Sequence, residues 1–173
     1  MGRVSVKENK NMYQLKREAL GLSRERASEL LEGISPERIE KIESEKSLPH
    51  PDEVLLMAQG YKDPALCNYF CARECPIGRK YVPQIAPRSL SEIVLEMLAS
   101  LNGMQAKRER LIEITSNGRV DDHEVEDFVK IQETLAKISE TAEALRLWEE
   151  QMLAEGKINM DLYKQFRGEK RKG

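Results

Sequence analysis

Three cysteines are the residues of this 173-residue sequence with the clearest capacity for chemistry. Cys67, Cys71 and Cys75 are spaced by four, which on a helix places them along one stripe, and Pro76 follows directly. Convergent thiolates can hold a metal ion or an iron–sulfur cluster, and cluster sequences often have a proline after the last cysteine. A metal or cluster site at these cysteines is therefore one hypothesis, with a fourth ligand from a histidine, an aspartate or a second subunit.

The same cysteines have two other interpretations. Thiols stacked along a straight helix point in parallel and do not converge on one ion. Cysteine is also among the most buried residue types, and Leu66, Tyr69 and Phe70 interleave with the stripe, which favours packing on an N-terminal core. A redox-sensing thiol is the third hypothesis. An odd number of cysteines in one short stretch argues against a secreted disulfide framework.

No catalytic constellation accompanies the cysteines. His50 and His123 are isolated in the sequence, and neither a Ser–His–Asp pattern nor a glycine-rich phosphate loop is present. We therefore expect a protein that is not an enzyme, and no small-molecule substrate is evident.

The composition predicts an α-helical protein. Hydrophobic residues make up 40% and charged residues 34%, and the mean hydropathy is -0.59, values typical of globular proteins. Aromatic residues, at 5%, are too few for a typical β-rich fold. Because no apolar run approaches the roughly 18 residues of a membrane span, we expect a cytoplasmic protein with no membrane partner.

The charge is unevenly distributed. A net charge of -2 would by itself count against a nucleic-acid partner. Residues 88–150, however, contain 14 acidic and eight basic residues, whereas residues 151–173 contain three acidic and six basic residues. Much of the acid is therefore confined to one segment, and the chain ends in a basic tail.

Proline and glycine divide the chain in the middle. Pro76, Gly78, Pro83 and Pro87 fall within twelve residues, so we place a linker at 76–88. Residues 1–75 contain several short helical patterns and form the first predicted domain. Residues 89–153 form the second, and residues 154–173 are the basic tail, with Lys164, Arg167, Lys170, Arg171 and Lys172.

The second domain has heptad periodicity. Apolar residues recur at alternating intervals of three and four from Leu90 to Leu111 and again from Phe128 to Met152. Ser89 with Glu92 forms a capping box before the first run, and Asp121 or Asp122 caps the second. The pattern predicts two long helices in an antiparallel coiled-coil hairpin, and hence an all-α protein whose N-terminal domain consists of several helices.

A two-helix hairpin leaves apolar surface to be covered. Ile93, Leu98, Ile112, Val129 and Leu147 widen the apolar stripe, and either a second copy or the N-terminal domain must cover it. We expect a homodimer, since symmetric self-association is common. The expected dimerisation residues are Leu90, Val94, Met97, Leu101, Met104, Phe128, Ile131, Leu135, Ile138, Leu145 and Trp148.

Residues 12–59 carry the pattern with the most direct functional meaning. Leu22-Ser23 precedes a short helix, Gly33-Ile34-Ser35 forms a turn and an N-cap, and Pro36 begins a helix that contains Ile39 and ends at Ile42-Glu43. Lys46, Pro49 and the apolar run 54–58 follow. This segment of about 50 residues resembles the phage-repressor or Cro-like (XRE-type) helix-turn-helix family of transcription regulators.

The resemblance implies that double-stranded DNA is the partner and that the helix from Pro36 to about Ser44 enters the major groove. Arg38 would then pair with guanine, and Glu37 or Glu40 would accept from cytosine. The DNA-binding residues implied in this way are Arg24, Arg26, Ser35, Glu37, Arg38, Glu40, Lys41 and Lys46.

An alternative remains open. Glu37, Glu40, Glu43 and Glu45 crowd the helix that would enter the groove, and carboxylates are repelled by phosphates. A helix-turn-helix adaptor that binds protein without reading DNA, or a regulator that senses metal or redox state through its cysteines, would fit the same sequence.

Overall fold

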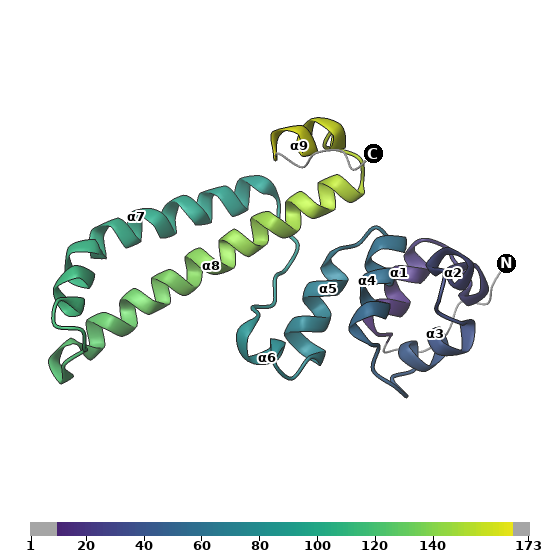
Figure 1. Cartoon of the computed structure of the whole chain (residues 1–173), viewed down its shortest axis with the longest axis horizontal. Helices are drawn as coiled ribbons and strands as arrows, with labels where there is room; N and C mark the ends of the chain where they lie inside the picture. The colour runs from purple at the N-terminus through teal and green to yellow at the C-terminus, as the bar shows by residue number, and fades with distance from the viewer. Residues whose placement is uncertain (1–9, 168–173) are drawn as a thin grey trace. The chain divides into compact units, whose positions relative to one another are not determined.

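The computed structural model describes residues 10–167 and divides the chain into two compact units. Among the described residues, unit 1 comprises residues 10–84 and 150–167, and unit 2 comprises residues 85–149. All regular elements between residues 10 and 167 are helical, so the prediction of an all-α fold is confirmed (Figure 1). The tail residues Lys170, Arg171 and Lys172 lie outside the described residues.

Unit 1 is built from short helices with clear start signals. Asn11, Ser23 and Ser35 are N-caps whose side chains each accept a hydrogen bond from a backbone N–H in the first turn. The helices are α1 (Met12–Ala19), α2 (Arg24–Leu31), α3 (Pro36–Glu43), α4 (Pro51–Gly60), α5 (Ala65–Tyr69), the π-helical turn η1 (Phe70–Glu74), α6 (Gly78–Tyr81) and, after residue 150, α9 (Met160–Phe166).

One hydrophobic core joins α1 to α5. Each helix contributes the apolar residues that recur on one of its faces, which is why the short helices are stable together. The buried members are Tyr13, Ala27, Leu31, Ile34, Ile39, Ile42, Val54, Met57, Ala58, Tyr61 and Leu66, and Cys67 packs against them while partly exposed.

A short helix lies where the sequence predicted a linker. Within 76–88, residues 78–81 form α6, which packs against η1. A Cβ atom on Gly78 would lie 1.9 Å from the backbone oxygen of Cys71, so this approach requires glycine. The proline-rich stretch is therefore partly structured and belongs to unit 1 up to Gln84.

Unit 2 is the predicted antiparallel hairpin. Its helices are α7 (Leu90–Thr115), the 3-10 turn η2 (Asp122–Glu124) and α8 (Val125–Ala154), whose residues from Glu150 onward belong to unit 1. The expected capping box of Ser89 and Glu92 begins α7. The Lys107 ammonium donates to Thr134 Oγ1 at 2.7 Å, which joins the two helices in mid-hairpin.

The buried seam of the hairpin differs from the heptad seam read from the sequence. The buried residues of α7 include Ile93 and Ser100, whereas their neighbours Val94 and Leu101 are 39% and 47% exposed. On α8 the polar Thr141 is fully buried, and Leu135 is exposed. Small polar residues thus occupy inner positions, where their hydroxyls are satisfied by hydrogen bonds to backbone oxygens one turn earlier, as in Ser100 and Thr141.

In the part of the chain that the structure describes, no helix is long and apolar enough to cross a membrane.

Candidate nucleic-acid interface

The helix-turn-helix core consists of α2, a turn and α3. Ser23 Oγ accepts from Arg26 N, and Ser35 Oγ accepts from Arg38 N, both at 3.2 Å, so each helix begins at a serine cap. Glu32 and Gly33 both have positive φ, at 36° and 147°, and produce the turn between the helices. Ile34 is buried directly after the turn and anchors it to the core.

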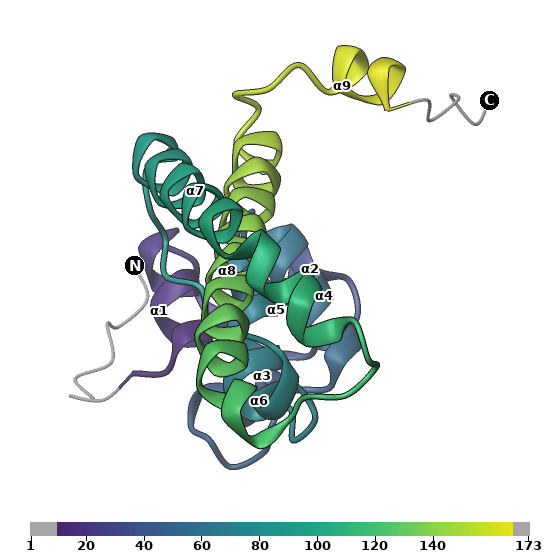
Figure 2. The same cartoon turned by 90° about the vertical axis from the view of Figure 1, so that its left-hand side faces the viewer.

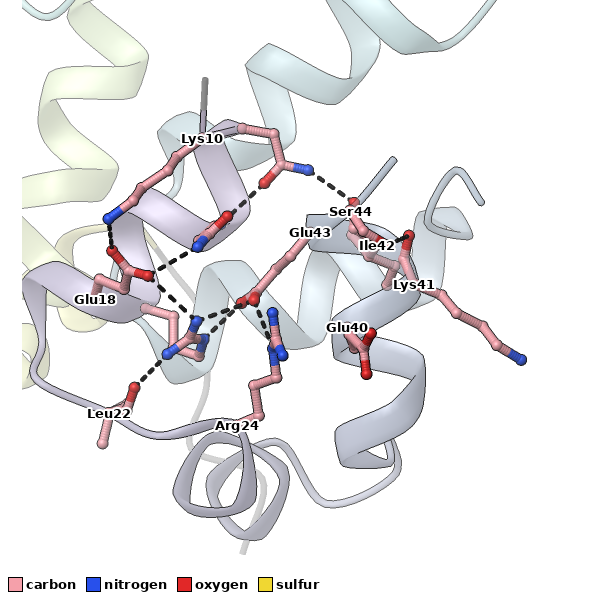
Figure 3. A network of polar contacts seen from close by, with 12 residues as sticks. Lys10, Glu18, Leu22, Arg24, Glu40, Lys41, Ile42, Glu43 and Ser44 are labelled. Atoms are coloured by element: carbon pink, nitrogen blue, oxygen red, sulfur yellow. Dashed lines mark hydrogen bonds and ion pairs between the residues drawn. The ribbon is translucent and has the colours of Figure 1, made fainter. Parts of the chain in front are cut away.

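A buried ionic network fixes α3 to the helices before it (Figure 3). The Glu43 carboxylate, 1% exposed, accepts from Arg17 Nε at 2.5 Å and from Arg24 Nε at 2.9 Å. Arg17 also donates to the carbonyl oxygen of Leu22, at the end of the α1–α2 connection. The C-terminal end of α3 is thereby joined to α1 and to the start of α2, so the angle between α2 and α3 is held by charge-assisted hydrogen bonds.

A second network fixes the turn after α3. Arg38 Nε and Nη2 donate to the two carboxylate oxygens of Glu53, each at 2.6 Å. Arg38 also donates to Ser47 Oγ at 2.7 Å and to the Leu48 oxygen at 2.9 Å. The Arg38 hydrogen bond is the main reason that the pKa of Glu53 lies below its usual range. The structure therefore places Arg38 against α4 and the α3–α4 turn, where its donors are already engaged.

The other predicted DNA-binding residues surround α3 in different environments. Glu37, Glu40 and Lys41 are exposed on α3, and no ion pair is found for Lys41 within residues 10–167. Lys46 approaches Glu40 at 3.7 Å. Hydrogen bonds from its own backbone N–H and from the Ser35 hydroxyl lower the pKa of Glu37, so this carboxylate is ionised near neutral pH.

Three of the predicted residues have structural contacts. Arg24 pairs with Glu43 and is about one-third exposed, Arg26 pairs with Glu29 on the surface, and Ser35 is the cap of α3. Glu37, Glu40, Lys41 and Lys46 thus lie near one another on the exposed side of α3. Arg38, in contrast, contacts the α3–α4 turn and α4.

Sequence reasoning missed the partners of these arginines. The sequence predicts Glu43 as part of the motif and as a repulsive charge, but its side chain is buried between Arg17 and Arg24. The spacing of Glu43 from Ile39 and Ile42 places it on the inward face of α3, and this spacing predicts a buried carboxylate. Glu53 at the third position of α4 could have been identified from its place in a capping box with His50.

The three cysteines lie where the α-helix α5 passes into the π-helical turn η1 and then into extended backbone. Cys67 is in α5, Cys71 is in η1, and Cys75 ends the helix with extended backbone, at φ -74° and ψ 122°. Cys75 Sγ accepts from the backbone N–H of Gly78 at 3.4 Å. Between residues 10 and 167, no group of three or more His, Cys, Asp or Glu side chains is arranged to hold a metal ion. The observed contacts of the cysteines are with the core and with α6.

Comparisons with known proteins bear on the N-terminal helices alone. Searches of the curated proteins and of the solved structures gave no match. Residues 14–62, from α1 to the end of α4, match the family model described as Helix-turn-helix. These are the residues whose geometry is described above, so the predicted resemblance is confirmed: residues 14–62 form a helix-turn-helix domain.

Proposed function

We propose that this chain is a sequence-specific regulator of transcription that binds double-stranded DNA as a dimer. One observation carries the proposal. Both ends of α3 are fixed by buried or half-buried arginine–carboxylate pairs, while Glu37, Glu40 and Lys41 on the same helix are exposed. A rigid helix whose exposed side chains are polar is what recognition in the major groove requires.

The base contacts follow from the exposed groups. Glu37 is ionised and acts as an acceptor, which suits the N4 amino group of cytosine, and Lys41 can donate to O6 and N7 of guanine. Arg38 is engaged by Glu53, so we assign it to holding the α3–α4 turn. The affinity of each subunit is limited by its two exposed glutamates, which makes a second subunit important for a specific complex.

The hairpin supplies a surface for that second subunit. Val94 and Leu101 of α7 are exposed and come directly after the buried residues Ile93 and Ser100. Leu135 of α8 is exposed and comes directly after the half-buried Thr134. When two helices pack antiparallel, the residues that directly follow inward-facing residues lie on the same face of the helix pair. Leu90 and Leu98 extend the exposed apolar face on α7. Exposed apolar side chains on one face of a domain mark an interaction site, and symmetric pairing of this face would form a four-helix interface.

One experiment tests both parts of the proposal. Duplexes bound by the purified protein are selected from a random DNA library, and the mass of the protein is measured by light scattering on the same sample. We expect enrichment of a sequence with two related half-sites, and a mass twice that of the 19.9 kDa chain. Failure to bind any duplex at about 50 mM salt, where phosphate contacts are strongest, would refute DNA binding and leave the protein-binding adaptor.

A matched pair of variants locates the reading surface. Glu37→Gln alters an exposed group of α3, and Glu29→Gln alters an exposed glutamate of α2. The first should change the preferred base at one position of each half-site, and the second should leave the selected sequence unchanged. Identical selections for wild type and Glu37→Gln would show that α3 does not read the base that we assign to this carboxylate.

A further inference from the structure

The segment from Pro64 to Gln84 carries a net positive charge, whereas residues 14–62, which precede it, carry more acidic than basic side chains. It contains Arg73, Arg79 and Lys80 but a single acidic residue, Glu74. Residues 14–62 match the helix-turn-helix family, so this segment lies beyond the matched domain. It therefore offers cations that the helix-turn-helix domain does not account for.

The one acidic side chain of the segment points toward the core. Glu74 is half-buried, and its Oε2 accepts from the Tyr13 hydroxyl at 2.8 Å. Burial raises the pKa of Glu74. This carboxylate is thus held by Tyr13 of α1 and is partly shielded from the surface.

The basic side chains, in contrast, are exposed and not neutralised. No ion pair is found for Arg79 or Lys80 among the residues that the structure describes, and both are exposed on α6. Lys80 lies over the ring of Tyr81 at 5.4 Å, and Arg73 lies over Tyr69 at 5.9 Å, contacts that leave the positive charge in place. The segment therefore presents concentrated positive charge to solvent.

This basic surface is fixed to the body of unit 1. The Gly78 backbone approaches the oxygen of Cys71 too closely for any side chain at this position, and Asn68 Nδ2 donates to the Pro83 oxygen at 3.0 Å. Arg73 Nε donates to Gln84 Oε1 at 2.8 Å. Because both ends of α6 are attached to α5 and η1, its cations keep a constant position relative to α3.

The views of the structure place α6 and α3 on the same side of unit 1. Both helices lie along its lower edge in Figure 1, and in Figure 2, turned by 90°, α6 stands in front of α3 at that edge. A rod-shaped polyanion that contacts α3 along this edge would also pass α6.

We propose that Arg79 and Lys80, with Arg73 beside them, form a second DNA contact that binds backbone phosphates next to the site read by α3. The inference rests on the proposed function, because it assigns these residues to the same DNA. The contact is independent of base sequence, since it uses charges on a short helix and no group directed at base edges. It compensates for the two exposed glutamates of α3 by adding positive charge from outside the helix-turn-helix domain.

The test is the salt dependence of binding to a labelled duplex of about 20 base pairs with no selected sequence. The double variant Arg79→Gln/Lys80→Gln should reduce the slope of log K against log salt concentration by about 2 and weaken binding at least tenfold at low salt. Lys80→Gln alone should reduce the slope by about 1. The matched control is Lys62→Gln, an exposed lysine of the same unit in the α4–α5 connection, whose slope should equal that of the wild type.

The outcomes separate this inference from the proposed function. If the wild type binds no duplex, the proposed function fails before any variant is compared. If the wild type binds and the double variant keeps the wild-type slope, or if Lys62→Gln lowers the slope as much as Lys80→Gln, the contact at α6 is refuted while DNA binding stands. Circular dichroism of each variant verifies that the fold is retained, as expected for exposed side chains.

Discussion

Arg38 and Glu53 form a bidentate ion pair, in which Arg38 Nε and Nη2 each donate to a different carboxylate oxygen of Glu53 at 2.6 Å. The pair joins the first turn of α3 to the first turn of α4, and the side chains are 22% and 14% exposed. Arginine and carboxylate in this arrangement form one of the stronger charge-assisted contacts in proteins. Arg38 therefore contributes to the stability of the domain and to the position of α3.

The first prediction concerns that pair. Arg38→Ala should lower the free energy of unfolding by about 1–2 kcal/mol, because Glu53 loses its guanidinium partner. The selected DNA sequence should stay the same in the folded variant. Chemical denaturation and repeated selection measure the two effects. If Arg38→Ala changed the selected DNA sequence and left the free energy of unfolding unchanged, Arg38 would be a DNA-reading residue and this prediction would be wrong. Arg26→Ala, which breaks an exposed pair with Glu29, is the control and should have little effect on stability.

The second prediction concerns pH. The folded-state pKa of Glu53 is lowered, mainly by its hydrogen bond from Arg38, so its contribution is present above the ordinary carboxylate pKa and is lost as the pH falls through the lowered value. The pKa of Glu74 is raised by burial, so the sign is opposite and its ionisation opposes folding at higher pH.

Denaturation between about pH 7 and about pH 3 tests both signs. The stability advantage of the wild type over Glu53→Gln should shrink as the pH falls. The free energy of unfolding of the wild type should rise relative to that of Glu74→Gln as the pH falls from about 7 to about 3. Parallel pH profiles for the wild type and the two variants would contradict the assignment of these environments.

The third prediction concerns the buried carboxylate. Glu43→Ala removes the buried carboxylate that Arg17 and Arg24 share and leaves Arg17 only the more distant Glu18 carboxylate at 3.7 Å. The variant should lower the free energy of unfolding by about 3 kcal/mol, much of the total for a small domain. Glu40→Ala, an exposed glutamate on the same helix, should change stability little. Equal stabilities of the two variants would show that Glu43 does not hold α3 in place.

The fourth prediction concerns the end of α3. Glu45 has φ 60°, and the N–H groups of Glu45 and Lys46 donate to the oxygens of Ile42 and Lys41, a helix termination that favours glycine. Glu45→Gly should stabilise the domain by roughly 0.5–1 kcal/mol. Glu29→Gly, which removes the same charge from the interior of α2, should destabilise it by about 1 kcal/mol. Thermal unfolding compares the two, and a loss of stability in Glu45→Gly would contradict the strain at this residue.

The fifth prediction concerns self-association. Leu101→Glu places a charge on the exposed apolar face of α7 and should convert a dimer into a monomer of 19.9 kDa. Ala106→Glu adds the same charge at another exposed position of α7 and should leave the mass unchanged. Light scattering across a concentration series gives both masses. A dimer that survives Leu101→Glu would place the interface elsewhere.

Elements with strong local signals could be predicted from the sequence. The serine caps and Pro36 define where α2 and α3 begin, and the heptads of α7 and α8 predict two long helices. The existence of each helix depends on spacing and capping within a few residues, which a sequence displays directly.

The roles of charged residues could not be predicted in the same way. Arg38 and Glu53 are 15 residues apart, and Arg17 and Glu43 are 26 apart, so their pairing depends on tertiary structure. An arginine at an outward position of a recognition helix has the same local sequence whether it pairs with a base or with a neighbouring helix. The same limit applies to the hairpin, where Ser100 and Thr141 are buried and Leu101 and Leu135 are exposed, because the way in which the two helices pack is a tertiary property.

The attachment of α3 at its two ends has a consequence for how this protein can change. The contacts that hold the helix use Arg17, Arg38, Glu43 and Glu53, none of which is among the exposed residues of α3. Substitutions at Glu37, Glu40 and Lys41 therefore carry little penalty in folding. Under the proposed function, new base preferences would then arise at these positions one residue at a time, with the contacts that hold α3 left intact.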